Sequence, residues 1–208
     1  MQDLAIIYQD DHIIAINKPA GLLTVPGLAT PDNAFDQLVQ QHPNSRVVHR
    51  LDMATSGLVI FPQSHESLVR FGRLFEQRKM TKTYTAMVAG IVAEDRGEIT
   101  LPLICDWPNR PKQKVDLEQG KHAHTQYQVL ERRLALQTTR VELTPITGRS
   151  HQLRVHMQQL GHPILGDAFY APDAIRQASD RLLLHATTLE FVHPFTHSPT
   201  SIHCEPDF

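Results

Sequence analysis

The chain has 208 residues, of which 41% are hydrophobic, and this size and composition suit a soluble globular protein of one large or two small domains. The formal net charge of −2 argues against a uniformly basic nucleic-acid-binding domain. No stretch of about 18 uncharged apolar residues predicts a membrane span, and the acidic N-terminal segment is not typical of a secretory signal. We therefore expect a cytoplasmic protein without a membrane partner, in which Cys105 and Cys204 are reduced thiols.

Positive charge is concentrated in two parts of the sequence. Residues 46–84 contain seven Lys and Arg against three acidic residues, and residues 107–154 contain nine against four. The rest of the chain is therefore acidic. This distribution fits a single face that binds a polyanion, but it fits equally well charges scattered over a solvated surface.

The first 61 residues have the pattern of short strands. Two runs rich in β-branched residues, 5–8 and 12–17, end at a turn formed by residues 18–21. Residues 57–61, GLVIF, have the composition of a buried strand.

A helix and another strand are predicted next. Residues 64–79 have helical periodicity, with Ser64 as the N-cap and an apolar face made by Leu68, Phe71, Leu74 and Phe75. Residues 81–90 alternate as a strand does.

The second half of the chain predicts more strands and one short helix. Residues 124–131 and 135–144 are expected to pair as a hairpin, and residues 181–193 form a last strand. Residues 150–161 predict a helix with Ser150 as its cap. Strands without regularly intervening helices favour an α+β fold with a mixed or mainly antiparallel sheet. We find no internal repeat or linker and expect one domain over residues 1–208.

The segment HRLDMATSGLVIF, residues 49–61, places Asp52 at the start of the predicted buried strand. An aspartate in such a place most often closes a turn by accepting backbone hydrogen bonds. The competing hypothesis is a functional carboxylate, because Arg50, Arg149 and Arg154 all lie at or in predicted apolar elements. Arginines in such positions are typical of a site that gathers an anion.

The segment TGRSHQLRVH, residues 147–156, places Arg149 just before a predicted helix N-terminus, which favours an anion such as a phosphate or an ionised carboxylate. Pairing of Arg149 with a surface glutamate is the alternative. His151 and His156 are five residues apart instead of the four of a zinc helix, and the sequence has no HExxH or CxxC pattern. We expect no metal site.

Two further features have both a functional and an ordinary interpretation. CDWPNRPKQKV, residues 105–115, places Arg110, Lys112 and Lys114 beside the only tryptophan, which suits an exposed loop on a phosphate backbone. Tyr84 lies in a predicted strand, where a tyrosine is more often part of the core than of a site.

Five segments occur in the order and form of one known family, and the chain resembles the RluA family of pseudouridine synthases. They are NKPAGLLTVPG (17–27), HRLDMATSGLVIF (49–61), KTYTAMVAG (82–90), TGRSHQLRVHMQQLGHPILGD (147–167) and RLLLHA (181–186). CDWPNRPKQKV narrows the resemblance to members that act on both tRNA and large-subunit ribosomal RNA.

The resemblance implies the pseudouridine-synthase α+β fold, a long, mixed, mainly antiparallel sheet with a central catalytic cleft and flanking helices. It implies a catalytic carboxylate at Asp52, an arginine paired with it at Arg149, and a tyrosine that stacks on the flipped uracil at Tyr84. Leu183 or Leu184 would contact the base, and Arg50 would enter the RNA stack as the uridine leaves. Further RNA contacts are expected at His49, Arg110, Lys112, Lys114 and Arg154.

The implied partners are a tRNA anticodon loop and a 23S rRNA hairpin loop, and the implied enzyme is a monomer without an S4 RNA-binding domain. The reaction moves uracil from N1 to C5 on the same sugar, so it needs no cofactor and no metal. Whether Asp52 attacks C1′, adds to C6 or removes the C2′ proton stays open from the sequence.

Overall fold

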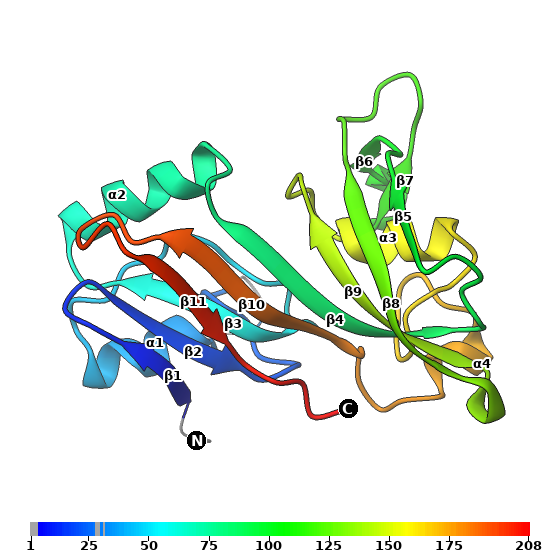
Figure 1. The fold of residues 1–208 in the computed structure, drawn as a ribbon, viewed down its shortest axis with the longest axis horizontal. Helices are drawn as coiled ribbons and strands as arrows, with labels where there is room; N and C mark the ends of the chain where they lie inside the picture. Colours follow the sequence, from blue (N-terminus) through cyan, green and yellow to red (C-terminus); the bar gives the residue numbers. More distant parts are fainter. Residues whose placement is uncertain (1–3, 28–29, 31) are drawn as a thin grey trace. The chain divides into compact units, whose positions relative to one another are not determined.

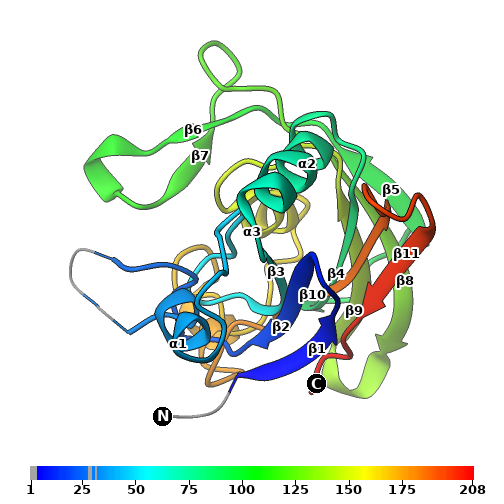
Figure 2. The same ribbon diagram turned by 90° about the vertical axis from the view of Figure 1, so that its left-hand side faces the viewer.

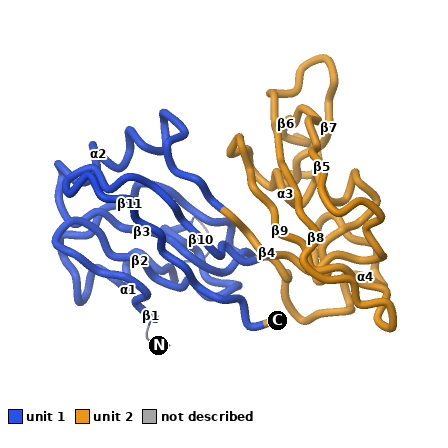
Figure 3. The backbone as a smooth tube through the Cα atoms, viewed as in Figure 1, with its two compact units in different colours: residues 1–82, 185–207 blue, residues 83–184, 208 orange. Residues whose placement is uncertain are grey.

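The computed structural model describes residues 4–27, 30 and 32–208. Two compact units can be distinguished, unit 1 with residues 1–82 and 185–207 and unit 2 with residues 83–184 and 208 (Figure 3). The described strands form a large, mainly antiparallel sheet with few helices (Figure 1), which confirms the predicted α+β class. No helix in the described part of the chain has the length and apolar character needed to cross a bilayer.

The strands of unit 1 follow the predicted apolar runs and add one at the C-terminal end. They are β1 (Ala5–Gln9), β2 (Ile13–Lys18), β3 (Ser56–Pro62), β10 (Leu184–Val192) and β11 (Pro199–His203). β1, β2 and β3 pair antiparallel in this order, β3 and β10 pair in parallel, and β11 pairs antiparallel with β10. β11 was not predicted from the sequence.

Two helices cover opposite faces of β3, all seven residues of which are buried. Phe71 of α2 (His65–Glu76) packs in one core cluster with Leu58 and Ile60. Phe61 points to the other side, as alternation along a strand requires, and stacks on Phe35 of α1 (Ala34–Gln41) with ring centroids 6.1 Å apart. The core therefore lies on both sides of the strand that follows Asp52.

The helix predicted over residues 64–79 is confirmed at its start and shorter at its end. The side chain of Ser64 caps α2 by accepting a hydrogen bond from the Ser67 N–H. The helix ends at Glu76 because Arg78 adopts a left-handed conformation, with φ of 55°.

Unit 2 is built around an antiparallel set of strands in the order β4, β9, β8 and β5, with a separate two-stranded hairpin. The strands are β4 (Thr81–Ala89), β5 (Arg96–Ile99), β6 (Leu103–Cys105), β7 (Gln113–Val115), β8 (Thr125–Arg133) and β9 (Thr138–Pro145). The predicted hairpin of two long strands is confirmed as β8 and β9. The β6–β7 hairpin extends away from the other strands of unit 2 (Figure 2).

The helices of unit 2 are short. They are the α-helices α3 (Gln152–Gln159) and α4 (Asp173–Arg176) and the 3-10 turns η1 (Trp107–Asn109) and η2 (Leu134–Leu136). The expected cap at Ser150 is wrong: α3 begins at Gln152, and the preceding residue, His151, has a positive φ of 52° and makes no side-chain cap bond.

Candidate active site

Asp52 lies in the loop between residue 49 and β3. Residues of the segment 18–24 form hydrogen bonds with the backbone of this loop and hold it in place. The Thr24 hydroxyl donates to the Leu51 carbonyl at 2.9 Å and accepts from the Leu51 N–H at 3.1 Å. On the other side of Asp52, the Gly21 N–H donates to the Met53 carbonyl at 2.8 Å. Both neighbours of Asp52 are therefore fixed, so the position of the half-buried carboxylate is largely determined by the backbone.

A buried lysine adds further hydrogen bonds to those made by Gly21 and Thr24. We call Lys18, Gly21 and Thr24 together the cradle of Asp52. The Lys18 ammonium is inaccessible to solvent and donates to the carbonyls of Pro19, Leu22 and Met53 at 2.8, 2.7 and 3.2 Å. Burial lowers the pKa of Lys18 to about 7, and the negative charge of Asp52 opposes part of that shift. Asp52 thus has a cationic neighbour within its own unit.

Gly57 allows β3 to follow immediately after this loop. It has a φ of 109° and pairs with Ala186 of β10, and a Cβ on Gly57 would lie 2.3 Å from the Ala186 carbonyl oxygen. Only glycine fits this close approach. The small residue at the end of ATSG is thus required by the packing of two strands.

His49 and Arg50 are adjacent in sequence but have different environments. The His49 Nε2 accepts a hydrogen bond from the Ile60 N–H at 3.0 Å, and its ring stacks on Phe75 at 4.7 Å. Burial, and to a lesser degree the charge of Lys82, lowers the pKa of His49 to about 3. His49 is therefore a neutral residue that supports the segment, whereas the side chain of Arg50 is exposed.

Tyr84 and Leu183 belong to one neighbourhood of unit 2. Tyr84 lies on β4 opposite Leu143 of β9 and is half-buried. The backbone of Leu183 runs beside the same β4 strand, because its carbonyl accepts from the Met87 N–H at 3.1 Å. Leu183 is half-buried and Leu184 only 3% exposed, so Leu183 is the better placed of the two predicted base contacts.

Arg149 lies in an exposed loop that the side chain of Gln152 holds in place. The Gln152 amide oxygen accepts from the Arg149 N–H at 3.0 Å and from the Thr147 hydroxyl at 2.7 Å. Its amide nitrogen donates to the His124 carbonyl at 2.9 Å. The Arg149 guanidinium donates through Nε to the His122 carbonyl at 3.0 Å, which orients an otherwise exposed cation.

The prediction that Arg154 binds RNA is wrong. Arg154 is 3% exposed and forms two hydrogen bonds with the Asp167 carboxylate, 2.8 Å from Nε and 2.6 Å from one terminal nitrogen. Its guanidinium also lies over the rings of Phe169 and Tyr170 at 5.0 and 5.1 Å. This bidentate, buried pair serves the packing of α3, because a guanidinium so enclosed has no path to a phosphate.

The β6–β7 arm, residues 103–115, contains the segment 105–115 that was predicted as an exposed loop, and residues 107–111 of it are exposed. Trp107 is 66% exposed, and the Arg110 guanidinium lies 4.4 Å from the centre of its ring. Lys114 is exposed, and Lys112 is half-buried near Phe169. At the first residue of β7, next to the turn of the arm, the Tyr170 hydroxyl accepts from the Gln113 N–H at 2.8 Å. The arm therefore presents cations and an aromatic ring beside a backbone position that Tyr170 holds.

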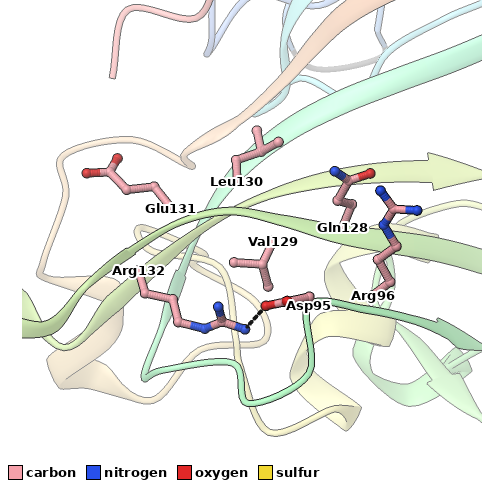
Figure 4. A pocket seen from close by; sticks show the side chains of 7 residues that line it. All are labelled: Asp95, Arg96, Gln128, Val129, Leu130, Glu131 and Arg132. Carbon is pink, nitrogen blue, oxygen red and sulfur yellow. Dashed lines mark ion pairs between the residues drawn. The ribbon is translucent and has the colours of Figure 1, made fainter.

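One pocket of about 320 Å³ lies elsewhere in unit 2, beside the register shift of β8 (Figure 4). Its lining residues are Asp95, Arg96, Gln128, Val129, Leu130, Glu131 and Arg132. The ion pair between Arg132 and Asp95, at 2.7 Å, spans part of this lining. No predicted site residue contributes to it, so we do not assign this pocket to the reaction. Among the described residues, no cluster of three or more His, Cys, Asp or Glu could hold a metal ion.

Sequence reasoning missed Lys18, Gly21, Thr24 and Gln152 as parts of the site. The first three belong to NKPAGLLT, part of a segment that carries the family resemblance but in which no site residue was predicted, and their partners lie about 30 residues further along the chain. A lysine that closes an apolar strand was the available signal, because an ammonium in such a place needs several acceptors. For Gln152 the sequence carried no comparable signal.

Comparisons with known proteins identify the family of the chain. Residues 12–159 match the family model described as RNA pseudouridylate synthase. A protein from Yersinia pestis named dual-specificity RNA pseudouridine synthase RluA is 50% identical, with 99% of this chain and 100% of that protein covered. A protein of the same name from Escherichia coli K12 is 49% identical over 99% and 94%.

A solved structure, human RNA pseudouridylate synthase domain containing 1, also resembles the chain. It is 29% identical, its TM-score is 0.85, and the alignment covers 100% of this chain and 85% of the human one.

Proposed function

The chain belongs to the RNA pseudouridylate synthase family, and from this premise we propose that it isomerises uridines in a tRNA anticodon loop and in a 23S rRNA hairpin loop. It is an RNA pseudouridine synthase, an isomerase. The proposal of two RNA substrates is supported by relatives that are 50% identical to this chain and are named dual-specificity enzymes. Two small loops that splay their bases in the same way would satisfy one shape-reading enzyme.

The proposed reaction requires an ionised carboxylate in a site that excludes water. The C1′–N1 bond breaks, the uracil turns, and a bond from C5 to C1′ replaces it; C5 loses its proton and N1 takes one up. Nothing is oxidised, reduced or hydrolysed, so the proposed reaction uses no cofactor and no metal. The base must first leave its stack, which costs a few kcal/mol.

We assign the carboxylate to Asp52. The observation that carries this assignment is the cradle formed by Lys18, Gly21 and Thr24, which fixes the backbone on both sides of Asp52 and places a buried ammonium near it. A turn aspartate would need no such support. Three routes remain for its action: attack on C1′, addition to C6, and removal of the C2′ proton.

Tyr84 and Arg149 complete the proposed catalytic group. Tyr84, half-buried on β4, is assigned to stack on the freed uracil and to limit competition by water. Arg149, oriented through the loop that Gln152 holds, is assigned to keep the carboxylate charged. Leu183 is the preferred apolar contact to the base, because it is half-buried whereas Leu184 is 3% exposed.

RNA binding is assigned to cations in both units, all of them exposed except the half-buried Lys112. Arg50 fills the vacated stack, where a planar guanidinium offsets part of the flipping cost. Arg110, Lys112 and Lys114 of the β6–β7 arm contact phosphates. His49 acts indirectly, by supporting the backbone that carries Arg50 and Asp52.

We further propose that both units make up a single catalytic domain that acts as a monomer in the cytoplasm. The family match supports this, since residues 12–159 run through segments of both units. Two free cysteines fit a reducing compartment.

Tritium release from transcripts labelled at C5 of uridine tests the proposed function, because the C5 proton is lost as the new bond forms. We expect the wild-type protein to release tritium from a tRNA anticodon stem-loop and from a 23S rRNA hairpin. The variant Asp52→Ala is expected to lose at least a thousandfold in rate while retaining RNA affinity, since the half-buried carboxylate takes no part in phosphate binding.

Asp11→Ala is the matched control, because Asp11 is an exposed aspartate in the turn between β1 and β2. It should keep the wild-type rate. RNA binding without tritium release by the wild-type protein would reject the assignment of these substrates. Full activity of Asp52→Ala would reject the assignment of the carboxylate.

A further inference from the structure

The C-terminal end of α2 carries exposed positive charge that the fold itself does not use. Arg73, Arg78 and Lys79, which we call the α2 cationic end, are all exposed. Within residues 4–27, 30 and 32–208, none of their side chains makes a hydrogen bond or an ion pair. Arg70 on the same helix differs: it pairs with Glu66 at 2.7 Å, donates to the Pro194 carbonyl and lies over the Phe195 ring.

The backbone at Arg78 would suit glycine better than arginine. Its φ of 55° is left-handed, and the Lys79 N–H donates to the Leu74 carbonyl at 2.8 Å while the Arg78 N–H donates to the Phe75 carbonyl. These two bonds form a Schellman motif, in which the left-handed residue is usually glycine. A side chain at this position is disfavoured by contact with its own backbone.

Complementing the helix dipole does not account for Arg78. Cations in the last turn of a helix do stabilise it, but Arg73 already occupies the last turn of α2. Arg78 lies two residues past the last helical residue, Glu76, where the effect of the dipole has decreased. An arginine at a position that favours glycine, without a partner among the residues that the structure describes, indicates a ligand outside the chain.

The α2 cationic end is linked within unit 1 to the segment that carries Asp52. The Phe75 ring in the last turn of α2 stacks on His49, and the Lys82 ammonium lies 5.9 Å from the centre of the same ring. His49 directly precedes Arg50, the residue assigned to the vacated RNA stack. A strand of RNA that reaches Arg50 would therefore pass close to the end of α2.

We propose that the α2 cationic end binds phosphate groups of the RNA strand that flanks the target uridine. This inference rests on the proposed function for the identity of the RNA. It adds a second contact surface, in unit 1, to the one expected on the β6–β7 arm. Each side chain would neutralise one phosphate and release its counterion, so binding through it depends on salt.

The variant Arg78→Gly tests the proposal because stability and binding should change in opposite directions. Removing the side chain relieves the left-handed backbone, and we expect Tm to rise by about 2–4 °C. RNA affinity at low salt should fall by about fivefold to tenfold, and the slope of log K against log salt should become shallower by about 0.7. Fluorescence anisotropy with a labelled anticodon stem-loop measures both quantities.

Arg70→Gln is the matched control, since it removes a positive charge from the same helix but one that is already paired. Arg70→Gln should lower Tm and leave the slope of log K against log salt unchanged. Lys79→Gln should make this slope shallower, as Arg78→Gly does. An Arg78→Gly protein with wild-type affinity and wild-type slope would overturn the proposal. Tritium release by the wild-type protein reports on the proposed function separately, so the two failures are distinguishable.

Discussion

At the scale of single residues, Lys18 shows how a buried charge supports a functional loop. Its ammonium has three carbonyl acceptors and the Asp52 carboxylate nearby, yet it is removed from solvent. Burial disfavours its protonated form and lowers its pKa to about 7, from an ordinary value of 10.5. Lys18 thus holds the loop of Asp52, but its burial lowers the free energy of unfolding by an amount that depends on pH.

The free energy of unfolding should report this cost. Between pH 7 and 10.5 the unfolded chain keeps a proton on Lys18 that the folded chain has lost, so this residue makes stability rise with pH in that window. Lys18→Met removes the group at similar length. We expect the wild type to gain stability over Lys18→Met by up to about 1.4 kcal/mol per pH unit above pH 7.

Urea unfolding of both proteins at pH 6.5, 8 and 9.5 measures the difference. Other titrating groups are common to the two proteins and largely cancel. A difference that stays constant over these three pH values would show that Lys18 does not titrate in this range.

At the scale of elements, the parallel pairing of β3 with β10 decides how the Asp52 loop enters the sheet. Ser56 pairs with His185 and Gly57 with Ala186, so the strand begins four residues after Asp52. Gly57 permits this through both its positive φ and its lack of a side chain. The sequence pattern of a buried strand does not reveal the second requirement, because Ala186 is 129 residues away.

Two glycine variants should separate these requirements. Gly57→Ala and Gly21→Ala both place a side chain at a positive φ, 109° and 86°, but only the Cβ on Gly57 meets backbone atoms. We expect about 1 kcal/mol of lost stability for Gly21→Ala and at least about 3 kcal/mol for Gly57→Ala, because the latter forces the two strands apart. Equal losses in thermal or urea unfolding would contradict a close strand contact.

At the scale of the whole molecule, an acidic chain carries cations in selected places. The net charge is −2, while Arg50, the α2 cationic end and the β6–β7 arm each expose positive side chains. The acidic remainder of the chain preserves solubility and disfavours unspecific association with polyanions. Binding should therefore depend on a limited number of phosphate contacts.

Salt dependence measures that number. Six cations assigned to phosphates, each with about 0.7 released counterions for single-stranded RNA, predict a slope of about −4 for log K against log salt. Tritium release should be unchanged in EDTA, because the proposed isomerisation needs no metal. A slope near −1, or loss of activity that returns on adding a divalent cation, would contradict these expectations.

Local pattern was sufficient to predict most regular elements. Alternation and β-branched runs located β1, β2, β3, β4, β8 and β9, and the cap at Ser64 located the start of α2. These features depend on neighbours a few residues apart. The end of α2 and the start of α3 were misplaced because left-handed residues, Arg78 and His151, set them without a glycine to mark the turn.

The sequence by itself determined the fold class, the family and the segment that contains Asp52, because periodicity and motif order are properties of the linear chain. Only the tertiary structure decided what each charged side chain does. Arg154 and Arg50 look alike in sequence, yet the first is buried against Asp167 and the second is exposed. Lys18 and Thr24 became parts of the site through contacts with residues about 30 positions away. Burial and pairing depend on which distant residues the fold brings together, so they are decided in space and not along the chain.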